Sequence, residues 1–517
     1  LTILFLLCNM RLLSIVTSET EDAGVGKNGI TLKIDKARGT IYDCNLKRIT
    51  NSSYRYVAAV SPTPEAIAAV GMLKNSQDVL KRLMAGKPVL IDSAPELNGD
   101  GINVFRVYNH FSANQLASHL VGYLDDTGNG VSGIEKGYNN ALASDGYLSI
   151  HYSCDAKGRV LTGINPDISN SQYDPTKGVV LTIDSEIQKE LERIMKKYIK
   201  TGAAVLIDVQ TGKIKASVSV PDFSPSSLAT SLKDPDSPLI NRAFTAFNTG
   251  SVFKCCVAAA ALEAGISPSY TCTGKINIGE VQFGCRHNHG TMNLESALAV
   301  SCNTYFINLG QQLGADRIYS MAKNLGFGNS LQLSDSIRSA SGNLPDYKTI
   351  KALPAALGNF SFGQGDLMTT PLQIASMCQT IANGGKKITP SLIEGEMSAN
   401  GVLVNKAPQN PYTRVISEKN ADILKQYMIN VVEHGTGTTA KPAKGGAGGK
   451  TATAETGWVI GGRSILQAWF AGFFPADQPK YALAIVVENG KSGSVSAAPV
   501  FKELAEVLYS ASNTLVQ

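Results

Sequence analysis

The sequence of 517 residues has little excess of charge of either sign: 47 Lys and Arg residues against 42 Asp and Glu residues leave a net charge of +5. It also lacks a basic tail, a zinc-finger spacing and an internal repeat of fixed period, so it does not indicate a nucleic-acid-binding or repeat protein. Glycine (49) and proline (21) are close to average usage, which excludes collagen-like and low-complexity chains. The nine cysteines are odd in number and form no regular disulfide framework.

The chain does have enough apolar residues to build a large core. They make up 43% of it, against 17% charged residues, which excludes wholesale disorder. At roughly 100–200 residues per domain, this length predicts two to four domains.

The first 16 residues are mostly apolar and are followed by a polar run from Thr17 to Gly26. The stretch is shorter than the ~20 residues of a spanning helix, is interrupted by Arg11, and shows no small-residue cleavage site. We interpret residues 1–16 as part of a signal-anchor segment, with the rest of the chain outside the membrane. A buried amphipathic helix is the alternative.

The turn and strand patterns of the sequence indicate two further regions. Residues 27–170 are expected to form an α+β module of short elements, with helical spacing at 63–86. A seam rich in Asn, Asp, Ser and Pro at 165–178 separates this module from a domain at 175–517. Predicted hairpins at 203–219 and 467–488 lie near the two ends of that domain, with helical segments between them. We therefore expect one sheet to which both ends contribute strands.

The sharpest local motif is Ser251-Val252-Phe253-Lys254, which opens the Ala-rich run 255–264. The run lacks Pro and Gly, so a helix is expected to start here. Positions i and i+3 share one face of a helix, so the lysine amine can reach the serine oxygen. A lysine buried near another cation loses proton affinity and can act as a base. An exposed lysine is the alternative interpretation, because S-x-x-K is common by chance.

Two more motifs follow along the chain. Ser301-Cys302-Asn303 comes after the helix-like run 294–300, and an ordinary polar helix end would look the same. Lys450-Thr451-Ala452 comes after a glycine-rich stretch at 445–449, where a loop that leads into an edge strand is the simpler interpretation.

Together and in this order, the three motifs match the S-x-x-K, S-D-N and K-T-G set of β-lactamases and penicillin-binding proteins. Their flanks NRAFTAFNTGSVFK, LAVSCNTYF, SFGQGDLMTTPLQIA and AWFAGFFPA resemble the transpeptidase domain of class B penicillin-binding proteins. Upstream, RGTIYD and GVSGIEKGYNNAL resemble the N-terminal pedestal of that family, so the resemblance covers nearly all of residues 30–510. It implies an α+β multi-domain protein: a dimerisation-like pedestal plus an antiparallel sheet flanked by helices, as in serine β-lactamases.

The resemblance also implies roles for individual residues. Ser251 is the acylated nucleophile, Lys254 its base, and Ser301 a proton relay. Asn303 holds Lys254 and the substrate amide, and the amides of Ser251 and Thr453 form the oxyanion hole. Lys450 and Thr451 bind the terminal carboxylate of the substrate, which a cation and a hydroxyl are suited to hold.

The sequence departs from the family pattern at two positions. Ala452 stands where the third motif usually has glycine, and its methyl group is expected to narrow the cleft or tilt the strand. Thr249 stands where many members have proline.

A second cluster has metal-ligand chemistry. Cys272, Cys285, His287 and His289 lie within 18 positions, and zinc prefers such ligands. The spacing is looser than that of zinc fingers. A structural zinc site, a Cys272–Cys285 disulfide and simple surface residues therefore remain as alternatives.

The resemblance implies a peptidoglycan D,D-transpeptidase that cross-links stem peptides ending in D-Ala-D-Ala, is inhibited by β-lactams and needs no cofactor for catalysis. A β-lactam-hydrolysing or β-lactam-sensing protein and a non-catalytic scaffold are the alternatives. The expected partners are a membrane glycan polymerase and other cell-wall synthesis proteins, because no glycosyltransferase domain fits before the seam.

Overall fold

The computed structural model describes residues 29–170, 173–460 and 462–514, and it divides the chain into two compact units. The first contains 29–38, Ser53–Asn109 and Ser144–Asp174; the second contains Gly39–Ser52, His110–Ala143 and the chain from Pro175 onward. The expected signal-anchor segment at 1–16 lies outside the described residues. Among the helices in the described ranges, none combines the length and apolar character that crossing a membrane requires.

The first unit consists of two small sheets and a helical pair. Its sheets have the strand orders β1-β6-β7 and β4-β3-β5. The strands are β1 (Gly29–Arg38), β3 (Ser53–Val60), β4 (Val89–Ser93), β5 (Ile102–Asn109), β6 (Ala143–Ser153) and β7 (Asp167–Ser169). Strand β3 alternates between two cores: Val57 and Ala59 pack with residues of β1 and β6, whereas Ala58 and Val60 pack with the helices.

Those helices are α2 (Pro64–Gly71) and α3 (Gln77–Met84), where the sequence showed one stretch of helical spacing. Thr63 caps α2 by accepting a hydrogen bond from the Ala66 amide, and Pro64 fits the first turn. Asn75, with φ of +59°, breaks the helical path between them.

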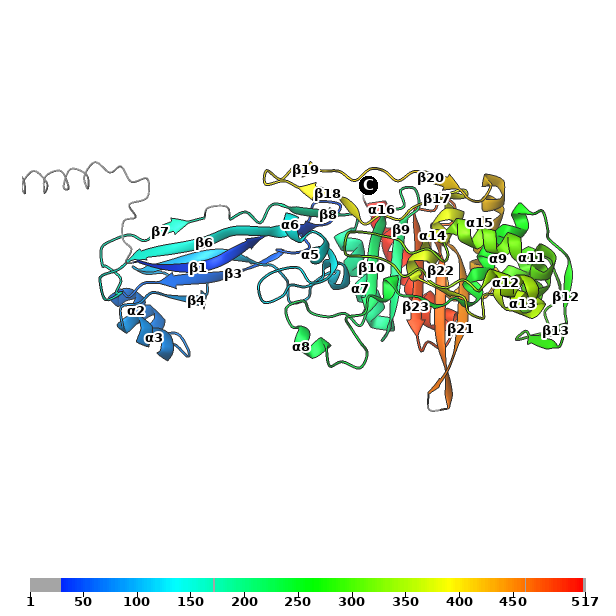
Figure 1. The fold of residues 1–517 in the computed structure, drawn as a ribbon, viewed down its shortest axis with the longest axis horizontal. Coiled ribbons are helices and arrows are strands. Elements are labelled where there is room, and N and C mark those ends of the chain that lie inside the picture. The colour runs from blue at the N-terminus through cyan, green and yellow to red at the C-terminus, as the bar shows by residue number, and fades with distance from the viewer. Residues whose placement is uncertain (1–28, 171–172, 461, 515–517) are drawn as a thin grey trace, which may run out of the picture. The chain divides into compact units, whose positions relative to one another are not determined.

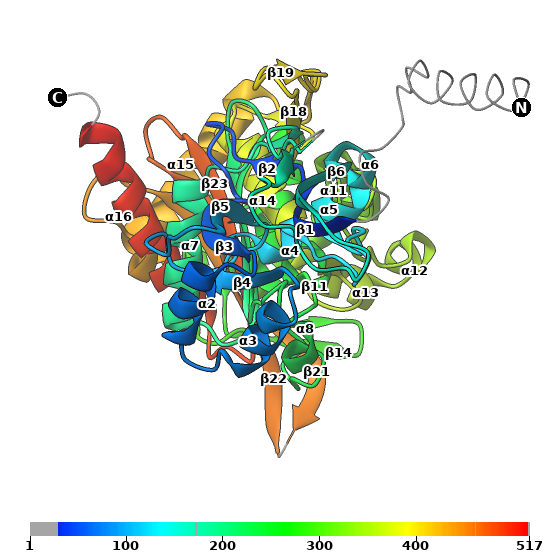
Figure 2. The ribbon, with the colours of Figure 1, turned by 90° about the vertical axis from the view of Figure 1, so that its left-hand side faces the viewer.

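The second unit is built on an antiparallel sheet of strand order β10-β9-β23-β22-β21 (Figure 1). The strands are β9 (Gly202–Asp208), β10 (Ile214–Val220), β21 (Gly448–Ile460), β22 (Arg463–Phe474) and β23 (Tyr481–Glu488). The hairpin β9–β10 pairs directly with β23, so the expected sheet with strands from both ends of the domain is confirmed. The β21–β22 hairpin extends beyond the other strands (Figure 2).

Both faces of this sheet are covered. In β9, Val205 faces the core shared with the helices around the motifs, whereas Leu206 faces the core shared with α7 and α16. The larger helices are α7 (Ser185–Tyr198), α9 (Lys254–Glu263), α11 (Asn303–Leu325), α13 (Pro354–Ser361), α14 (Pro371–Ala382), α15 (Glu418–His434) and α16 (Ala498–Thr514). The shorter ones are α4 (Ser118–Val121), α5 (Gly133–Gly137), α6 (Asn139–Leu142), α8 (Leu228–Ser231), α10 (Leu294–Ala299) and α12 (Tyr347–Ala352).

Short strands complete this unit. A four-stranded sheet has the order β19-β18-β8-β2 and contains β2 (Thr40–Tyr42), β8 (Gly178–Leu181), β18 (Ile393–Met397) and β19 (Leu403–Val404). Two-stranded pairs are β11 (Phe247–Asn248) with β16 (Met368–Thr369), β12 (Tyr270–Cys272) with β15 (Gly290–Met292), β13 (Lys275–Ile278) with β14 (Val281–Gly284), and β17 (Lys386–Ile388) with β20 (Tyr412–Arg414).

The units do not follow the expected boundary at residues 170–175 along the whole chain. Segments 39–52 and 110–143, expected in the N-terminal module, belong to the second unit. The reason lies in their packing: β2 pairs in parallel with β8, and Ile41 and Leu120 lie in the same core as Val205.

Candidate active site

Ser251 lies in a short 3₁₀ turn, η2 (Gly250–Phe253), and Lys254 is the first residue of α9. Gly250 has φ of +64°, a conformation that glycine adopts without strain. A Cβ atom at Gly250 would lie 3.1 Å from the Ala454 Cβ and 3.3 Å from the Ala452 Cβ. The turn that carries Ser251 therefore packs directly against the edge strand β21.

Lys254 is fully buried, and its ammonium group contacts the second motif. Its Nζ donates to the Ser301 carbonyl at 2.8 Å, to Ser301 Oγ at 3.2 Å and to Asn303 Oδ1 at 2.7 Å. Burial holds the pKa of Lys254 well below its ordinary value, and the positive charge of Lys450 lowers it further. A neutral amine donates only two hydrogen bonds, which the carbonyl and the amide oxygen can take. Its lone pair is then available to a hydroxyl proton.

Ser301 has a left-handed backbone, with φ of +57°, in the turn between α10 and α11. Such a conformation is uncommon outside glycine and asparagine, and it is typical of functional sites. In this turn both the carbonyl and the hydroxyl of Ser301 accept hydrogen bonds from Lys254. Cys302 is the N-cap of α11, and Asn303 is its first residue.

The third motif lies on β21, at the edge of the sheet. Lys450 is buried, and its Nζ donates to the Thr451 carbonyl at 3.0 Å. Burial lowers the pKa of Lys450 to about 8. Thr451 Oγ1 donates to Thr436 Oγ1 at 2.8 Å, which adds a second hydroxyl next to the motif. Thr436 follows α15, belongs to none of the three motifs and was not predicted from the sequence.

Ala452 is 4% exposed and belongs to the main core of the second unit. Its methyl group lies beside Gly250, in the contact between β21 and the Ser251 turn. Ala452 also lines the cleft, so the narrowing of the cleft by its methyl group stays a prediction.

An open cleft of about 910 Å³ joins the three motifs. Its lining includes Ser251, Ser301, Asn303, Thr451 and Thr453, so the second unit brings these predicted site residues together. Lys254 and Lys450 are buried and do not line it. Further lining residues that the sequence analysis did not single out are Arg286, Asp366, Thr436 and Glu455.

Next to the cleft, four side chains with metal-ligand chemistry converge. The ligand atoms of Cys272, Cys285, His289 and Cys302 all lie within 4.8 Å of one another. Cys302 thus takes the place expected for His287, whose side chain lines the cleft and whose carbonyl accepts from the Cys272 thiol at 3.7 Å. The cysteines are free thiols, so the disulfide alternative is not formed in this structure.

Hydrogen bonds connect this cluster to the second motif. The Asn303 amide donates to Cys285 Sγ at 3.3 Å, and the Asn303 side chain donates to the Gly284 carbonyl at 3.3 Å. Cys285 Sγ and Cys302 Sγ share a hydrogen bond at 3.8 Å, and this contact lowers the pKa of Cys285 and raises that of Cys302. Cys285 is therefore the thiol that most readily becomes a thiolate.

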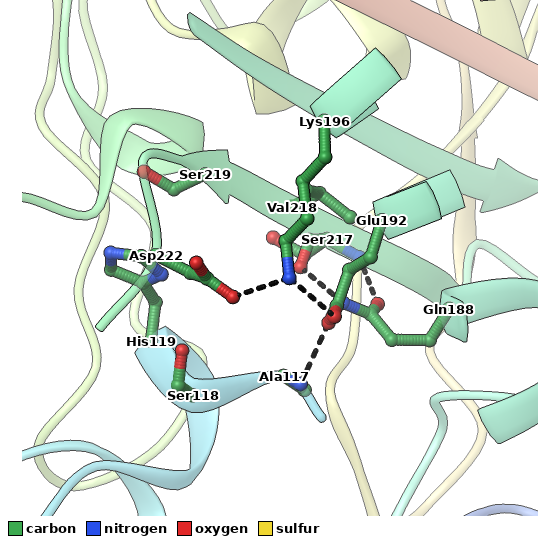
Figure 3. Close-up of a pocket in the computed structure, with 10 residues that line it drawn as sticks. All are labelled: Ala117, Ser118, His119, Gln188, Glu192, Lys196, Ser217, Val218, Ser219 and Asp222. Carbon is green, nitrogen blue, oxygen red and sulfur yellow. Dashed lines mark hydrogen bonds and ion pairs between the residues drawn. The ribbon is translucent and has the colours of Figure 1, made fainter. Parts of the chain in front are cut away.

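A second pocket in the same unit is small and already internally satisfied (Figure 3). Lys196 pairs with Asp222 at 2.6 Å and lies 3.9 Å from Glu192, which accepts hydrogen bonds from the Ala117 amide and Gln188. The cavity measures about 10 Å³, enough for one water molecule. It is a structural pocket with no room for a substrate.

Comparisons with known proteins agree with the geometry. The family described as "Penicillin binding protein transpeptidase domain" matches residues 202–506. Penicillin-binding protein PbpB of Mycolicibacterium smegmatis is 29% identical over 89% of this chain and 74% of its own length. Peptidoglycan D,D-transpeptidase PbpA of the same organism is 33% identical over 69% of this chain and 79% of its own length.

Among solved structures, one titled "Structural coordination of polymerization and crosslinking by a peptidoglycan synthase complex" superposes with a TM-score of 0.71 at 24% identity. It covers 97% of this chain and 96% of its own, and supports the fold. The family match, the relatives and the convergence of the three motifs on one cleft agree. The chain therefore belongs to the penicillin-binding protein transpeptidases, and the predicted resemblance to the class B members is confirmed.

Proposed function

We propose that this protein is a peptidoglycan D,D-transpeptidase that works through an acyl-enzyme on Ser251. The observation that carries the proposal is the environment of Lys254. The amine is buried, is hydrogen-bonded to Ser301 and Asn303, and lies one turn from Ser251 beside an open cleft. A lysine in this setting is neutral at a lower pH than usual, and it can take a proton from a neighbouring hydroxyl.

In the first half-reaction, Lys254 takes the Ser251 proton while Ser251 Oγ attacks the penultimate D-Ala carbonyl. The amides of Ser251 and Thr453 stabilise the oxyanion, a role supported by the packing of the Ser251 turn against β21. The carbon–nitrogen bond breaks, the terminal D-Ala leaves with a proton relayed by Ser301, and an ester remains on Ser251. The amine of a second stem peptide then attacks this ester. Water in its place would give a D-Ala-D-Ala carboxypeptidase reaction.

The terminal carboxylate of the substrate is bound by Lys450 and Thr451, with Thr436 as an added hydroxyl. Lys450 supplies charge, and the Thr436 hydroxyl, which accepts from Thr451, keeps its own proton to donate.

Intact-mass spectrometry after exposure to a labelled penicillin tests the proposal. One adduct per chain is expected, and peptide mapping should place it on the fragment that contains Ser251. Ser251→Ala should abolish labelling, whereas Ser227→Ala, at an exposed serine outside the cleft, should not. Lys254→Ala should slow acylation by ~10²–10⁴. Labelling that persists in Ser251→Ala would refute the assignment.

The same assay separates the classes of function. A transpeptidase releases D-alanine from a D-Ala-D-Ala peptide and keeps its penicillin adduct for a long time. A β-lactam-hydrolysing protein frees itself of the adduct rapidly, and a scaffold forms none.

We also propose that the cluster of Cys272, Cys285, Cys302 and His289 binds one structural zinc ion. Three thiolates and one imidazole form a common tetrahedral site, whose ~2.3 Å zinc–sulfur bonds place sulfurs about 3.8 Å apart. Cys285 and Cys302 are 3.8 Å apart, and His289 Nδ1 lies 3.6 Å from Cys272 and 3.4 Å from Cys285. The ion would hold the 285–289 loop to the N-terminus of α11. Catalysis itself needs no cofactor.

Elemental analysis of the purified full-length protein should find about one zinc per chain, and chelation should lower its melting temperature. Cys302→Ser keeps a capping oxygen on α11 but should lose the metal. His287→Ala should retain it, which distinguishes this ligand set from the one expected from sequence. Less than about 0.2 zinc per chain, well below the full occupancy of a structural site, would refute the proposal.

For the cellular setting, we propose a single-pass anchor at residues 1–16, an extracytoplasmic catalytic domain and a membrane glycan polymerase as partner. The apolar N-terminal run supports the anchor. The similar structure titled as a complex for polymerization and crosslinking supports the partner. Protease protection of the membrane-bound protein and co-purification with a glycan polymerase test the two proposals separately.

A further inference from the structure

The loop 285–289 connects β14 to β15 and is fixed next to the second motif. Cys285 donates its amide to the Gly274 carbonyl at 2.8 Å, and its sulfur accepts from the Asn303 amide. Asn303 also donates to the Gly284 carbonyl. Arg286 follows directly and lines the cleft that contains Ser251. The backbone position of Arg286 is therefore set by Asn303 on the catalytic side.

Arg286 differs from the other two cations of the site, Lys254 and Lys450, in its surroundings. It is exposed and forms no ion pair with any described residue, whereas Lys254 and Lys450 are buried and hydrogen-bonded. Arg286 is the only Arg or Lys among the described residues that line the cleft. Asp366 and Glu455 supply negative charge elsewhere in the lining. A guanidinium in a substrate cleft without a protein partner is suited to bind a carboxylate in bidentate fashion.

We propose that Arg286 determines specificity by binding a second carboxylate of the donor peptide, on the side chain that precedes D-Ala-D-Ala. This inference rests on the proposed function, in which Lys450 and Thr451 take the terminal carboxylate and Asn303 holds the substrate amide. The residue before that amide then passes next to the loop that Asn303 fixes. A carboxylate is the anion that a peptide substrate supplies.

The test uses two matched N-acetyl tripeptides, acetyl-L-Glu-D-Ala-D-Ala and acetyl-L-Gln-D-Ala-D-Ala, which differ only in one carboxylate. The full-length protein, Arg286→Gln, Arg286→Lys and the control Lys275→Gln are compared by the kcat/KM of D-alanine release and by protection of Ser251 from a fluorescent penicillin. Lys275 is an exposed cation on β13, where it is paired with Gly284 of β14, and it does not line the cleft. The control therefore removes the same charge nearby but outside the site.

Arg286→Gln should lower kcat/KM for the glutamate peptide by about 10- to 100-fold, the range for a hydrogen bond to a charged group, and leave the glutamine peptide within about threefold. Arg286→Lys should restore part of this selectivity, and Lys275→Gln should change neither peptide. Equal loss on both peptides, or no loss on either, would overturn the inference. If penicillin fails to label Ser251 in the unaltered protein, the proposed function itself fails, which is a different result.

Discussion

At the scale of single residues, burial lowers the pKa of both lysines to which we assign roles in the reaction, Lys254 and Lys450. Burial lowers the pKa of Lys254 and the nearby charge of Lys450 lowers it further, so its neutral form is favoured. Lys450 donates to the Thr451 carbonyl, and burial lowers its pKa to about 8, so it is still charged near neutral pH. One lysine can thus act as a base while the other attracts an anion.

This division predicts the alkaline side of the pH profile. Above pH about 8 the free protein loses the Lys450 charge, so kcat/KM for a D-Ala-D-Ala peptide should fall by up to tenfold per pH unit. A peptide with a C-terminal amide gives the control, because it has no carboxylate for Lys450 to attract and should show no such fall. Parallel profiles for the two peptides would contradict the assigned role.

Folding stability should change with pH in the opposite direction to kcat/KM. A lysine whose pKa is lowered on folding binds fewer protons in the native state than in the unfolded chain between pH about 8 and 10.5. The contribution of Lys450 to the free energy of unfolding therefore rises with pH in this window, by at most about 1.4 kcal/mol per unit. Urea unfolding of the protein and of Lys450→Met at pH 8 and 9.5 measures the difference.

Ala452→Gly should affect stability more than catalysis. The methyl is buried against the Ser251 turn, so its loss and the added flexibility of glycine should lower the free energy of unfolding by about 1–2 kcal/mol. Acylation by penicillin should stay within about threefold, because the methyl packs against Gly250, although Ala452 also lines the cleft. Ala454→Gly, also buried beside Gly250, is the matched control. A tenfold change in acylation at unchanged stability would place the Ala452 methyl in the substrate path.

At the scale of elements, secondary structure is predicted best where a single segment contains a recognisable local pattern. The hairpin at 203–219 was predicted from local strand and turn signals, and β9 and β10 match it closely. Cys302 was missed as a cluster member because its partners, Cys272, Cys285 and His289, lie on another segment, and no local spacing reveals that contact. His287 was included because sequence proximity does not show which way a loop side chain turns.

The start of α7 gives a prediction about stability. Asp184 accepts hydrogen bonds from the amides of Glu186 and Ile187, two of the unpaired donors of the first turn. Asp184→Ala should lower the free energy of unfolding by about 1 kcal/mol, whereas Asp184→Asn, which caps equally well, should lower it much less. Denaturant unfolding measures both, and equal losses would show that charge matters more than capping.

At the scale of the whole molecule, the second unit collects chain from three separate stretches. Segments 39–52 and 110–143 join it through the three-residue strand β2 and the short helices α4, α5 and α6. Elements this short have no periodic pattern from which their packing partners can be predicted. Both segments were therefore expected to belong to the N-terminal module. The seam near 175 was visible because it is a local change in composition.

Strand β23 should be essential to the fold of this unit, since it is the middle strand of the large sheet. Leu483→Asp would place a charge at a fully buried position and should abolish both cooperative unfolding and penicillin labelling. Lys502→Asp, at an exposed position on the following helix, should preserve both. Normal labelling of Leu483→Asp would show that the site forms without an intact sheet.

The order of strands also determines when the protein can finish folding. Hairpin β9–β10 is synthesised about 270 residues before β23, the strand that it must pair with. During synthesis one edge of that hairpin therefore remains open, and an unpaired strand edge invites association with other chains. Acquisition of penicillin binding should thus come only after the last tenth of the chain has been released, and the nascent protein would depend on chaperones that cover exposed strands during that delay.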